Sequence, residues 1–455
     1  MAINKTSQTS VGAFSDLFQY TYADVIIKLL DTVDDVEKWI DSINQEDWNG
    51  GDSRYQLYKT SEGSGSRFVS GGPGAAAPVL PAYNPPSYAE SMVRMYPHMD
   101  IVEITGPKLM RAHDKPGMYR QIMDELVSDV KNSHRNRVGP KYWEGSVGAP
   151  GTNSNNGVLC QVPLAAAVAA GTGIPVQQRE TLANYAGNAK AYMSAYAGAR
   201  YLRVGMQVQV GSAAQLTANT GTSGIITSVD QAAQTFTLDV ALPLNVVNQL
   251  VVEGDANGNE YGNTITGLYD AINDNGIYHG INRGGATPAT PWRSFITRNG
   301  NVLRDFNHWR ITNLLMQMSD LGPKDIDEMD PVIFSHNSLL QVYLQEIDPV
   351  YMQTDLKALK GHTTIAYQYG ARQIPWETAR SAPLNQYTIM DRSAMKRVKL
   401  GDYGWDSSTG GIFKQIPGTF AFQAYAYNEF ELVCENPRVQ AREEDIRVPT
   451  GLISV

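Results

Sequence analysis

The chain has few of the features that mark a disulfide scaffold, a metal knuckle or a membrane protein. Its 455 residues include two cysteines, Cys160 and Cys434, which lie far apart and form no CxxC motif. This argues against a structural metal knuckle or a disulfide framework, and makes a reducing compartment the default for folding. No apolar run reaches about 18 residues, so we expect no transmembrane helix and no membrane partner. The first residues also lack the apolar core of a secretory signal.

Motifs of catalysis are missing as well. None of the seven histidines forms an HExxH pattern, and neither GxSxG nor GxxxxGK[ST] occurs. The string most like a metal loop runs over residues 255–259, but Glu260 stands where an EF-hand needs glycine, and Thr266 stands where it needs a bidentate glutamate. We therefore expect a polar turn there, and no catalytic residue, cofactor or metal.

Charge is sparse and unevenly placed. Charged residues make up 18% of the chain, 41 residues are glycine, and the net charge is −9. That balance argues against nonspecific coating of nucleic acid. Residues 1–50 are strongly acidic, whereas residues 108–141 are basic. One interpretation is an acidic arm lying on a basic surface of a neighbouring subunit; the other is two solvated helix faces, and the pattern leaves both open.

The segment over residues 50–86 is the most informative. Two short alternating segments flank a Gly/Ser turn, which predicts a hairpin. Few large apolar residues lie in it, so it cannot bury a core of its own, yet it could reach roughly 60 Å from its root. We expect it to lie on another subunit. The alternative is a disordered linker, against which the strand-like Tyr55, Leu57, Phe68 and Val69 argue.

Apolar periodicity predicts the remaining elements. Apolar residues at helical spacing predict helices over residues 15–30, from residue 31 or 32 to 43, over 116–136, over 302–318 and over 339–347. Alternating or continuous apolar runs predict strands over 99–104, 201–210, 224–230, 235–240, 250–252 and 331–334, and a hairpin with arms at 420–426 and 430–434 that turns at 427–429. Four of these strands fall within residues 201–253, which predicts an inserted small β-barrel or β-sandwich.

A stretch rich in glycine and arginine follows. Tyr278-His279-Gly280-Ile281-Asn282-Arg283 precedes Trp292-Arg293, and Arg298, Arg304 and Arg310 come soon after. A phosphate-binding site is one interpretation. We favour pairing of these arginines with carboxylates across a subunit interface, because a guanidinium suits bidentate contacts.

This order of parts resembles the major capsid proteins of tailed bacteriophages with the Hong Kong 97-type fold. Tyr278, Gly280-Ile281, Arg283 and Trp292-Arg293 carry the local match, and residues 436–442 resemble the end of such proteins. The resemblance implies an α+β fold with a helical arm, an extended hairpin called the E-loop, and peripheral and axial domains. The implied boundaries are an N-terminal arm at 1–49, the E-loop at 50–87, a peripheral domain with a long spine helix at 88–200, the inserted β domain at 201–253, the peripheral domain again at 254–300, an axial domain at 301–415 and returning strands at 416–455.

The resemblance also implies a structural function without catalysis. Copies would form pentamers and hexamers of an icosahedral shell in the virion, assembled in the bacterial cytoplasm around double-stranded DNA that is not read by sequence. Portal and scaffolding proteins, and a decoration protein, would be partners. The alternatives are the shell of a prokaryotic nanocompartment and a phage tail structural protein. Some relatives cross-link a lysine of the hairpin to a neighbour's asparagine; Lys59 would be that lysine, with a surface ion pair as the alternative.

From these patterns we expect a set of subunit-contact residues. They come from the acidic arm, the hairpin and the arginine-rich stretch: Asp34, Asp35, Glu37, Trp39, Arg54, Tyr58, Lys59, Arg67, Arg283, Trp292 and Arg293.

Overall fold

The computed structural model describes the chain in segments. The described residues are 39–40, 43–48, 54–59, 61, 63–64, 82–105, 130, 133–134, 136–143, 157–163, 167–176, 198–243, 249–283, 292–300, 302–351, 365–370, 372–401, 403–406 and 414–448. The helix predicted over 15–30 lies outside them, as do most of the one predicted from residue 31 or 32 to 43, of which 39–40 are described and helical, and most of the one predicted over 116–136. Among the described residues, no helix is long and apolar enough to span a bilayer.

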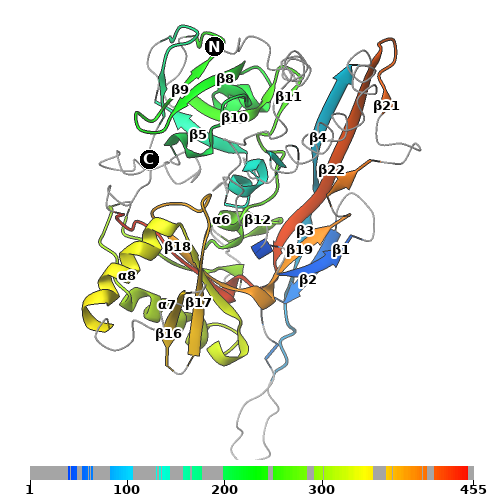
Figure 1. The fold of residues 1–455 in the computed structure, drawn as a ribbon. Helices are drawn as coiled ribbons and strands as arrows, with labels where there is room; N and C mark the ends of the chain where they lie inside the picture. The colour runs from blue at the N-terminus through cyan, green and yellow to red at the C-terminus, as the bar shows by residue number, and fades with distance from the viewer. Residues whose placement is uncertain are drawn as a thin grey trace, which may run out of the picture.

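The mixed sheet of the lower body packs two helices on one face. Its order is β14 (Phe295–Thr297), β23 (Gln440–Glu443), β18 (Tyr387–Asp391), β15 (Pro331–Ser335), β17 (Arg372–Thr378) and β16 (Ile365–Tyr369). Helices α7 (Trp309–Leu321) and α8 (Asn337–Tyr351) lie beside it (Figure 1). α8 confirms the helix predicted over 339–347, whereas α7 confirms only the later part of the one predicted over 302–318, because residues 302–308 are not helical. Both helices supply side chains to the same cluster as Ile333 of β15.

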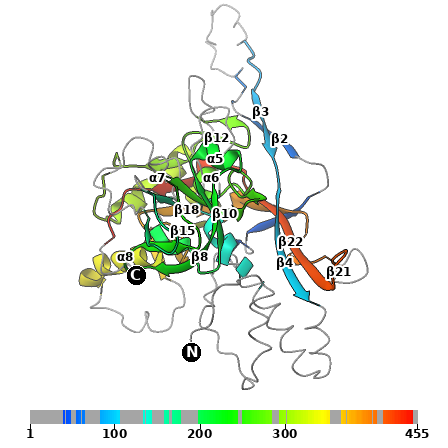
Figure 2. The same ribbon diagram turned by 90° about the horizontal axis from the view of Figure 1, so that it is seen from above.

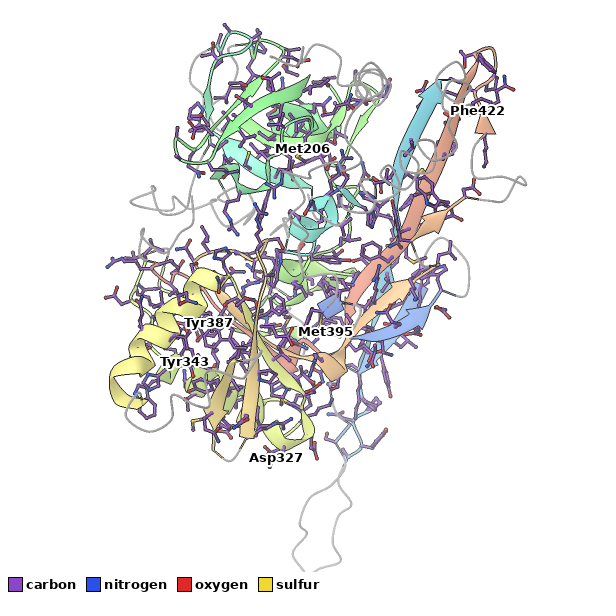
Figure 3. The ribbon with its side chains drawn as sticks, in the orientation of Figure 1. Met206, Asp327, Tyr343, Tyr387, Met395 and Phe422 are labelled. Atoms are coloured by element: carbon purple, nitrogen blue, oxygen red, sulfur yellow. The ribbon has the colours of Figure 1, made fainter. Side chains whose placement is uncertain are left out.

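The other face of this sheet is buried too. Successive side chains of a strand point to opposite faces, so Val332 and Phe334 of β15 enter a second core together with Trp39, Trp143 and Trp292. All five residues of β15 are consequently buried, as its unbroken apolar run predicted. Figure 3 marks Tyr343 and Tyr387 on the helix side. The ring of Tyr343 stacks on that of Trp376 at 4.6 Å, and the tilted ring of Tyr387 lies 6.2 Å from it.

A second sheet extends away from the body as a long ribbon. Its order is β1 (Asn44–Asp47), β19 (Met395–Lys399), β22 (Ala421–Cys434) and β20 (Gly404–Trp405), with β4 (Tyr96–Thr105) and β21 (Lys414–Gln415) also on β22. The turn predicted at residues 427–429 is wrong, because β22 continues through it. Asn428 favours turns in isolation, but here it pairs with His98 of β4, and the long-range ladder outweighs local propensity.

A third sheet forms the upper lobe in Figure 1. Its path is β11 (Gly258–Asn259), β10 (Gln249–Asp255), β7 (Gln207–Gly211), β8 (Thr222–Asp230), β9 (Thr235–Leu238) and β6 (Ile174–Pro175), with β5 (Val158–Val162) on β10 and the short helix α5 (Ala213–Thr217) between β7 and β8. The four predicted strands are present, although the first, predicted over 201–210, begins only at Gln207. The sheet also includes β5 and β6, which precede residue 201 in the chain. It therefore extends beyond the boundary expected for the inserted β domain.

Two further strands cross the other expected boundaries. β19, from the segment expected to be axial, pairs with β22 of the ribbon sheet, and β23 near the chain's end pairs with β18 of the helix-covered sheet. Each sheet is therefore assembled from distant segments rather than from one continuous stretch.

The first arm of the hairpin predicted between residues 50 and 86 is present, but its partner strand begins at residue 88. The second arm predicted directly after the Gly/Ser turn lies outside the described residues. β2 (Arg54–Lys59) pairs antiparallel with β3 (Tyr88–Val93), with Arg54 opposite Val93 and Lys59 opposite Tyr88. Backbone bonds of 2.7 and 2.9 Å between Ser64 and Asn84 continue the pairing beyond the strands. We call this unit, up to Ser64 and Asn84, the flap hairpin. Figure 2 shows that it and the β4–β22 ribbon point in opposite directions beside the body.

Candidate assembly surface

The inner face of the flap hairpin packs against the core of its own chain. The ring of Tyr58 lies 4.2 Å from that of Trp292, whose side chain is only 4% exposed. Ser91 and Val93 on the same face are fully buried, and the backbone N–H of Met92 donates a 2.8 Å bond to the carbonyl of His279. The root of the hairpin is thus held by one aromatic contact, buried side chains and a backbone bond.

The residues beneath the flap hairpin belong to the motif that carried the family resemblance. β12 (Ile277–Tyr278) and β13 (Ile281–Asn282) form a hairpin whose two turn residues, His279 and Gly280, have φ of 47° and 84°. Positive φ at both turn positions is the requirement of a type I′ turn, which glycine meets without strain. Tyr278 is fully buried, and its hydroxyl accepts a 2.9 Å bond from the Cys434 N–H. The motif therefore fixes where β3 leaves the body.

An ion-pair cluster ties the root of the flap hairpin to the ribbon sheet. Arg54 lies 2.5 Å from Glu46 of β1, and Lys396 of β19 bridges Glu46 and Glu435 at 3.4 and 2.6 Å. The hydrogen bond from Arg54 is the main cause that lowers the pKa of Glu46. Because each pair is partly exposed, we expect each to contribute about 0–1 kcal/mol, and to position the hairpin more than to stabilise the fold.

The outward face of the flap hairpin is largely exposed in the part of the chain that is described. Tyr55, Leu57 and Tyr88 project to this side and are 59%, 74% and 61% exposed. Lys59 lies on the same face and is exposed. Three large apolar side chains on one narrow ladder form an uncovered apolar strip, which we call the flap strip.

Two other elements expose apolar side chains. On α7, Trp309 and Met316 share one side and are 66% and 48% exposed. On the ribbon, Met99 and Ile101 are each 61% exposed, with Tyr427 opposite Met99 at 41%. The flap strip, α7 and the ribbon belong to separate parts of the molecule, so the exposed apolar surface is distributed and does not form one patch.

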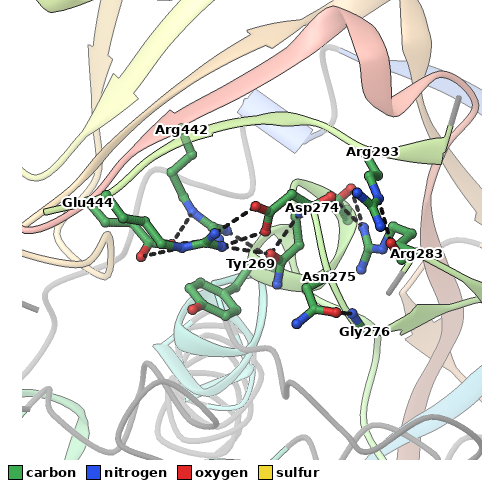
Figure 4. A network of polar contacts seen from close by, with 11 residues as sticks. Tyr269, Asp274, Asn275, Gly276, Arg283, Arg293, Arg442 and Glu444 are labelled. Atoms are coloured by element: carbon green, nitrogen blue, oxygen red, sulfur yellow. Dashed lines mark hydrogen bonds and ion pairs between the residues drawn. The ribbon is translucent and has the colours of Figure 1, made fainter. Parts of the chain in front are cut away.

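Three arginines of the arginine-rich stretch, Arg298, Arg304 and Arg310, pair with carboxylates of their own chain. Figure 4 shows Arg442 beside Glu444, at 2.8 Å, and Asp274, which accepts two 2.7 Å bonds from Arg298. Arg304 and Arg310 both reach Glu443, at 2.9 and 3.1 Å. These contacts join the 268–283 region, which includes the short helix α6 (Leu268–Ala271), and the residues after 292 to the C-terminal strand β23 and its following residues.

The predicted contact residues divide into three groups. Trp39, Arg283 and Trp292 are at most 4% exposed, so their side chains serve the core of this chain. Arg293 is half-buried and donates a 2.5 Å bond to the Arg283 carbonyl, and its place at a subunit contact stays a prediction. Large apolar or planar side chains in such patterns predict interface anchors, whereas the fold buries Trp39, Arg283 and Trp292 in the core. Arg54, Tyr58 and Lys59 lie together on the flap hairpin, while Asp34, Asp35, Glu37 and Arg67 lie outside the described residues.

Two further polar groups of residues lie away from the flap hairpin. The string at 255–259 is the expected polar turn: the Asp255 carboxylate accepts bonds of 2.8 and 3.2 Å from the N–H groups of Asn257 and Gly258. Sequence reasoning missed a convergence of His98, Asp100 and His134 between β4 and the helical residues that follow 133. The i, i+2 spacing of His98 and Asp100 on one strand face was the available signal.

No protein-family model and no curated protein matches the chain. Among solved structures, it is similar to the capsid asymmetric unit of cyanophage A-1(L), at 11% identity and a TM-score of 0.48, over 94% of this chain and 97% of that one. It is also similar to the capsid of Myoviridae phage XM1, at 8% identity, a TM-score of 0.42 and coverages of 95% and 98%. It is similar as well to the SrpI encapsulin complex of Synechococcus elongatus PCC 7942, at 7% identity, a TM-score of 0.37 and coverages of 99% of this chain and 98% of that one. All three TM-scores are below 0.5.

Proposed function

We propose that the chain is the structural subunit of a closed protein shell, as a phage major capsid protein is. The observation that carries the proposal is the flap strip. Tyr55, Leu57 and Tyr88 stand on a hairpin whose other face is already seated on the body, so no further fold of the described chain covers them. A second copy of the chain is the occupant we propose for this strip.

The distribution of exposed apolar residues supports a tiling subunit over a dimer. A two-fold dimer needs one self-complementary patch, whereas a subunit within a shell meets several neighbours through different surfaces. The flap strip, the Trp309 side of α7 and the Met99 side of the ribbon provide three such surfaces. Contacts that are weak one at a time become strong when each subunit makes several at once.

The proposal extends to the contents and the surroundings of the shell. Pentamers and hexamers would close an icosahedral shell around double-stranded DNA, within a virion assembled in the host cytoplasm with portal and scaffolding proteins. The net charge of −9 suits a container that must not hold DNA tightly. Neither a cofactor nor a catalytic step belongs to this role.

Electron microscopy of the purified chain, alone and with its scaffolding protein, tests the proposal. We expect closed shells or capsomer rings. Particles that protect DNA from nuclease support a capsid, shells filled with protein indicate a nanocompartment, and open tubes indicate a tail protein. A sample that contains only the 49.9 kDa chain under every assembly condition contradicts the proposal.

A further inference from the structure

Three potential ligand atoms converge between the ribbon and the helical residues behind it. His98 and Asp100 are alternate residues of β4, so their side chains share the face opposite Met99 and Ile101. His134 approaches that face from the other side. Its Nδ1 lies 3.0 Å from Asp100 Oδ2 and 3.1 Å from His98 Nδ1, and the His98 Nδ1 to Asp100 Oδ2 distance is 3.6 Å.

These separations match the edges of a metal coordination shell. A tetrahedral zinc ion with bonds of about 2.0–2.1 Å holds its ligand atoms about 3.3–3.4 Å apart. The three measured edges, 3.0, 3.1 and 3.6 Å, bracket that value. Two imidazoles and one carboxylate are also a donor set that zinc and related divalent ions accept.

We propose that His98, Asp100 and His134 bind one divalent transition-metal ion of the zinc class, with water as the fourth ligand. The ion would pin the helical residues around His134 to the base of the ribbon. This role is structural, does not depend on shell assembly, and belongs to the single chain.

The surroundings of the trio support a built site. The Tyr403 hydroxyl donates a 3.0 Å bond to Asp100 Oδ2, and its ring lies 4.0 Å from that of His134. Such outer contacts hold ligands in orientation. Asp100 and His134 are 7% and 2% exposed, which excludes competing bulk water from most of the site.

Access and electrostatics also suit a cation. His98 also lines a cavity of about 640 Å³, so one ligand of the trio borders an open space. The nearby cations are matched by carboxylates: Lys141 lies 2.6 Å from Glu260, and Arg137 lies 3.2 Å from Glu253. Their repulsion of a bound ion is therefore largely compensated.

Metal titration of the purified full-length chain tests the proposal. After loading with zinc and desalting, elemental analysis should find one zinc per chain, and cobalt should give the visible bands of a tetrahedral site. His98→Gln and Asp100→Asn should each weaken zinc binding more than about 100-fold, and Tyr403→Phe by about 10-fold, because it removes only an outer contact. The matched control is His308→Gln, which alters another histidine–carboxylate pair, His308 with Glu346 at 3.1 Å, and should bind zinc as the wild type does.

The thermal midpoint gives a second readout. Zinc should raise it for the wild type and the control but not for His98→Gln, because only a ligand that binds the folded state stabilises it. Circular dichroism of each variant without metal separates lost binding from lost folding. A wild type that keeps no zinc after desalting overturns the proposal, as does folded His98→Gln that binds zinc with unchanged affinity.

Discussion

At the scale of single residues, burial decides which large side chains serve the core. Arg283 has no exposed surface; its guanidinium donates to the carbonyl of Asn273 at 3.2 Å and lies 5.1 Å from the Tyr278 ring centre. Burial lowers its pKa to about 10, so it still carries its charge at neutral pH. The same reasoning places Trp292, beneath Tyr58, in the core.

Trp292→Ala should destabilise the isolated chain. Removing a tryptophan that is 4% exposed leaves a cavity that costs about 3–5 kcal/mol in the free energy of unfolding. Urea denaturation of the unassembled chain measures it. The matched control is Trp309→Ala, because Trp309 is 66% exposed and its loss should change stability by less than about 0.5 kcal/mol. Unchanged stability for Trp292→Ala, with assembly lost, would return this residue to the interface.

The Arg54–Glu46 pair should stabilise the chain in a pH-dependent way. The folded pKa of Glu46 is lower than its usual value of 4.5, so its contribution is complete above pH 4.5 and is lost as the pH falls through the lowered pKa. Arg54→Ala should therefore cost about 0–1 kcal/mol at pH 7 and almost nothing at the acid end. Denaturant midpoints of both proteins across this range measure the difference. A gap that widens toward low pH contradicts the assigned sign.

At the scale of elements, the apolar pattern of the sequence predicted those helices and strands that neighbouring residues are enough to form. Ile311, Leu314, Leu315 and Met318 recur at helical spacing, and α7 forms there with all four buried. The alternation in residues 54–59 likewise predicted β2. Local pattern failed at residues 427–429, because the sequence shows a turn-forming asparagine but not the ten-residue partner strand β4 that keeps β22 extended.

Leu57→Asn should separate folding from assembly. Leu57 is 74% exposed on the flap strip, so the change should move the free energy of unfolding by less than about 0.5 kcal/mol while it weakens shell formation. Val204→Asn, at a 45% exposed valine in the upper lobe, is the control and should assemble normally. Light scattering during assembly and unfolding curves of the free chains measure the two effects. Normal assembly of Leu57→Asn would remove the flap strip from the interface.

At the scale of the whole molecule, long-range pairing decides the architecture, and the sequence alone did not reveal it. β1 pairs with β19 some three hundred and fifty positions later in the chain, as the register Glu46 to Val398 records. The arginines after residue 292 find Glu443 and Glu444 in the same way. The convergence of His98, Asp100 and His134 depends on such a contact too, since only the fold brings the helical residues onto β4.

Thiol labelling tests the central claim, that the flap strip packs against another copy of the chain. Cys160 and Cys434 are both buried, and burial raises the pKa of each thiol, so Leu57→Cys adds the one reactive thiol among the described residues. Val204→Cys is the control on a surface that we do not assign to an interface. We predict that Leu57→Cys reacts rapidly with a maleimide in the free chain and becomes protected in the assembled shell, while Val204→Cys reacts in both. Equal labelling of Leu57→Cys in the free chain and in the closed shell would contradict the account.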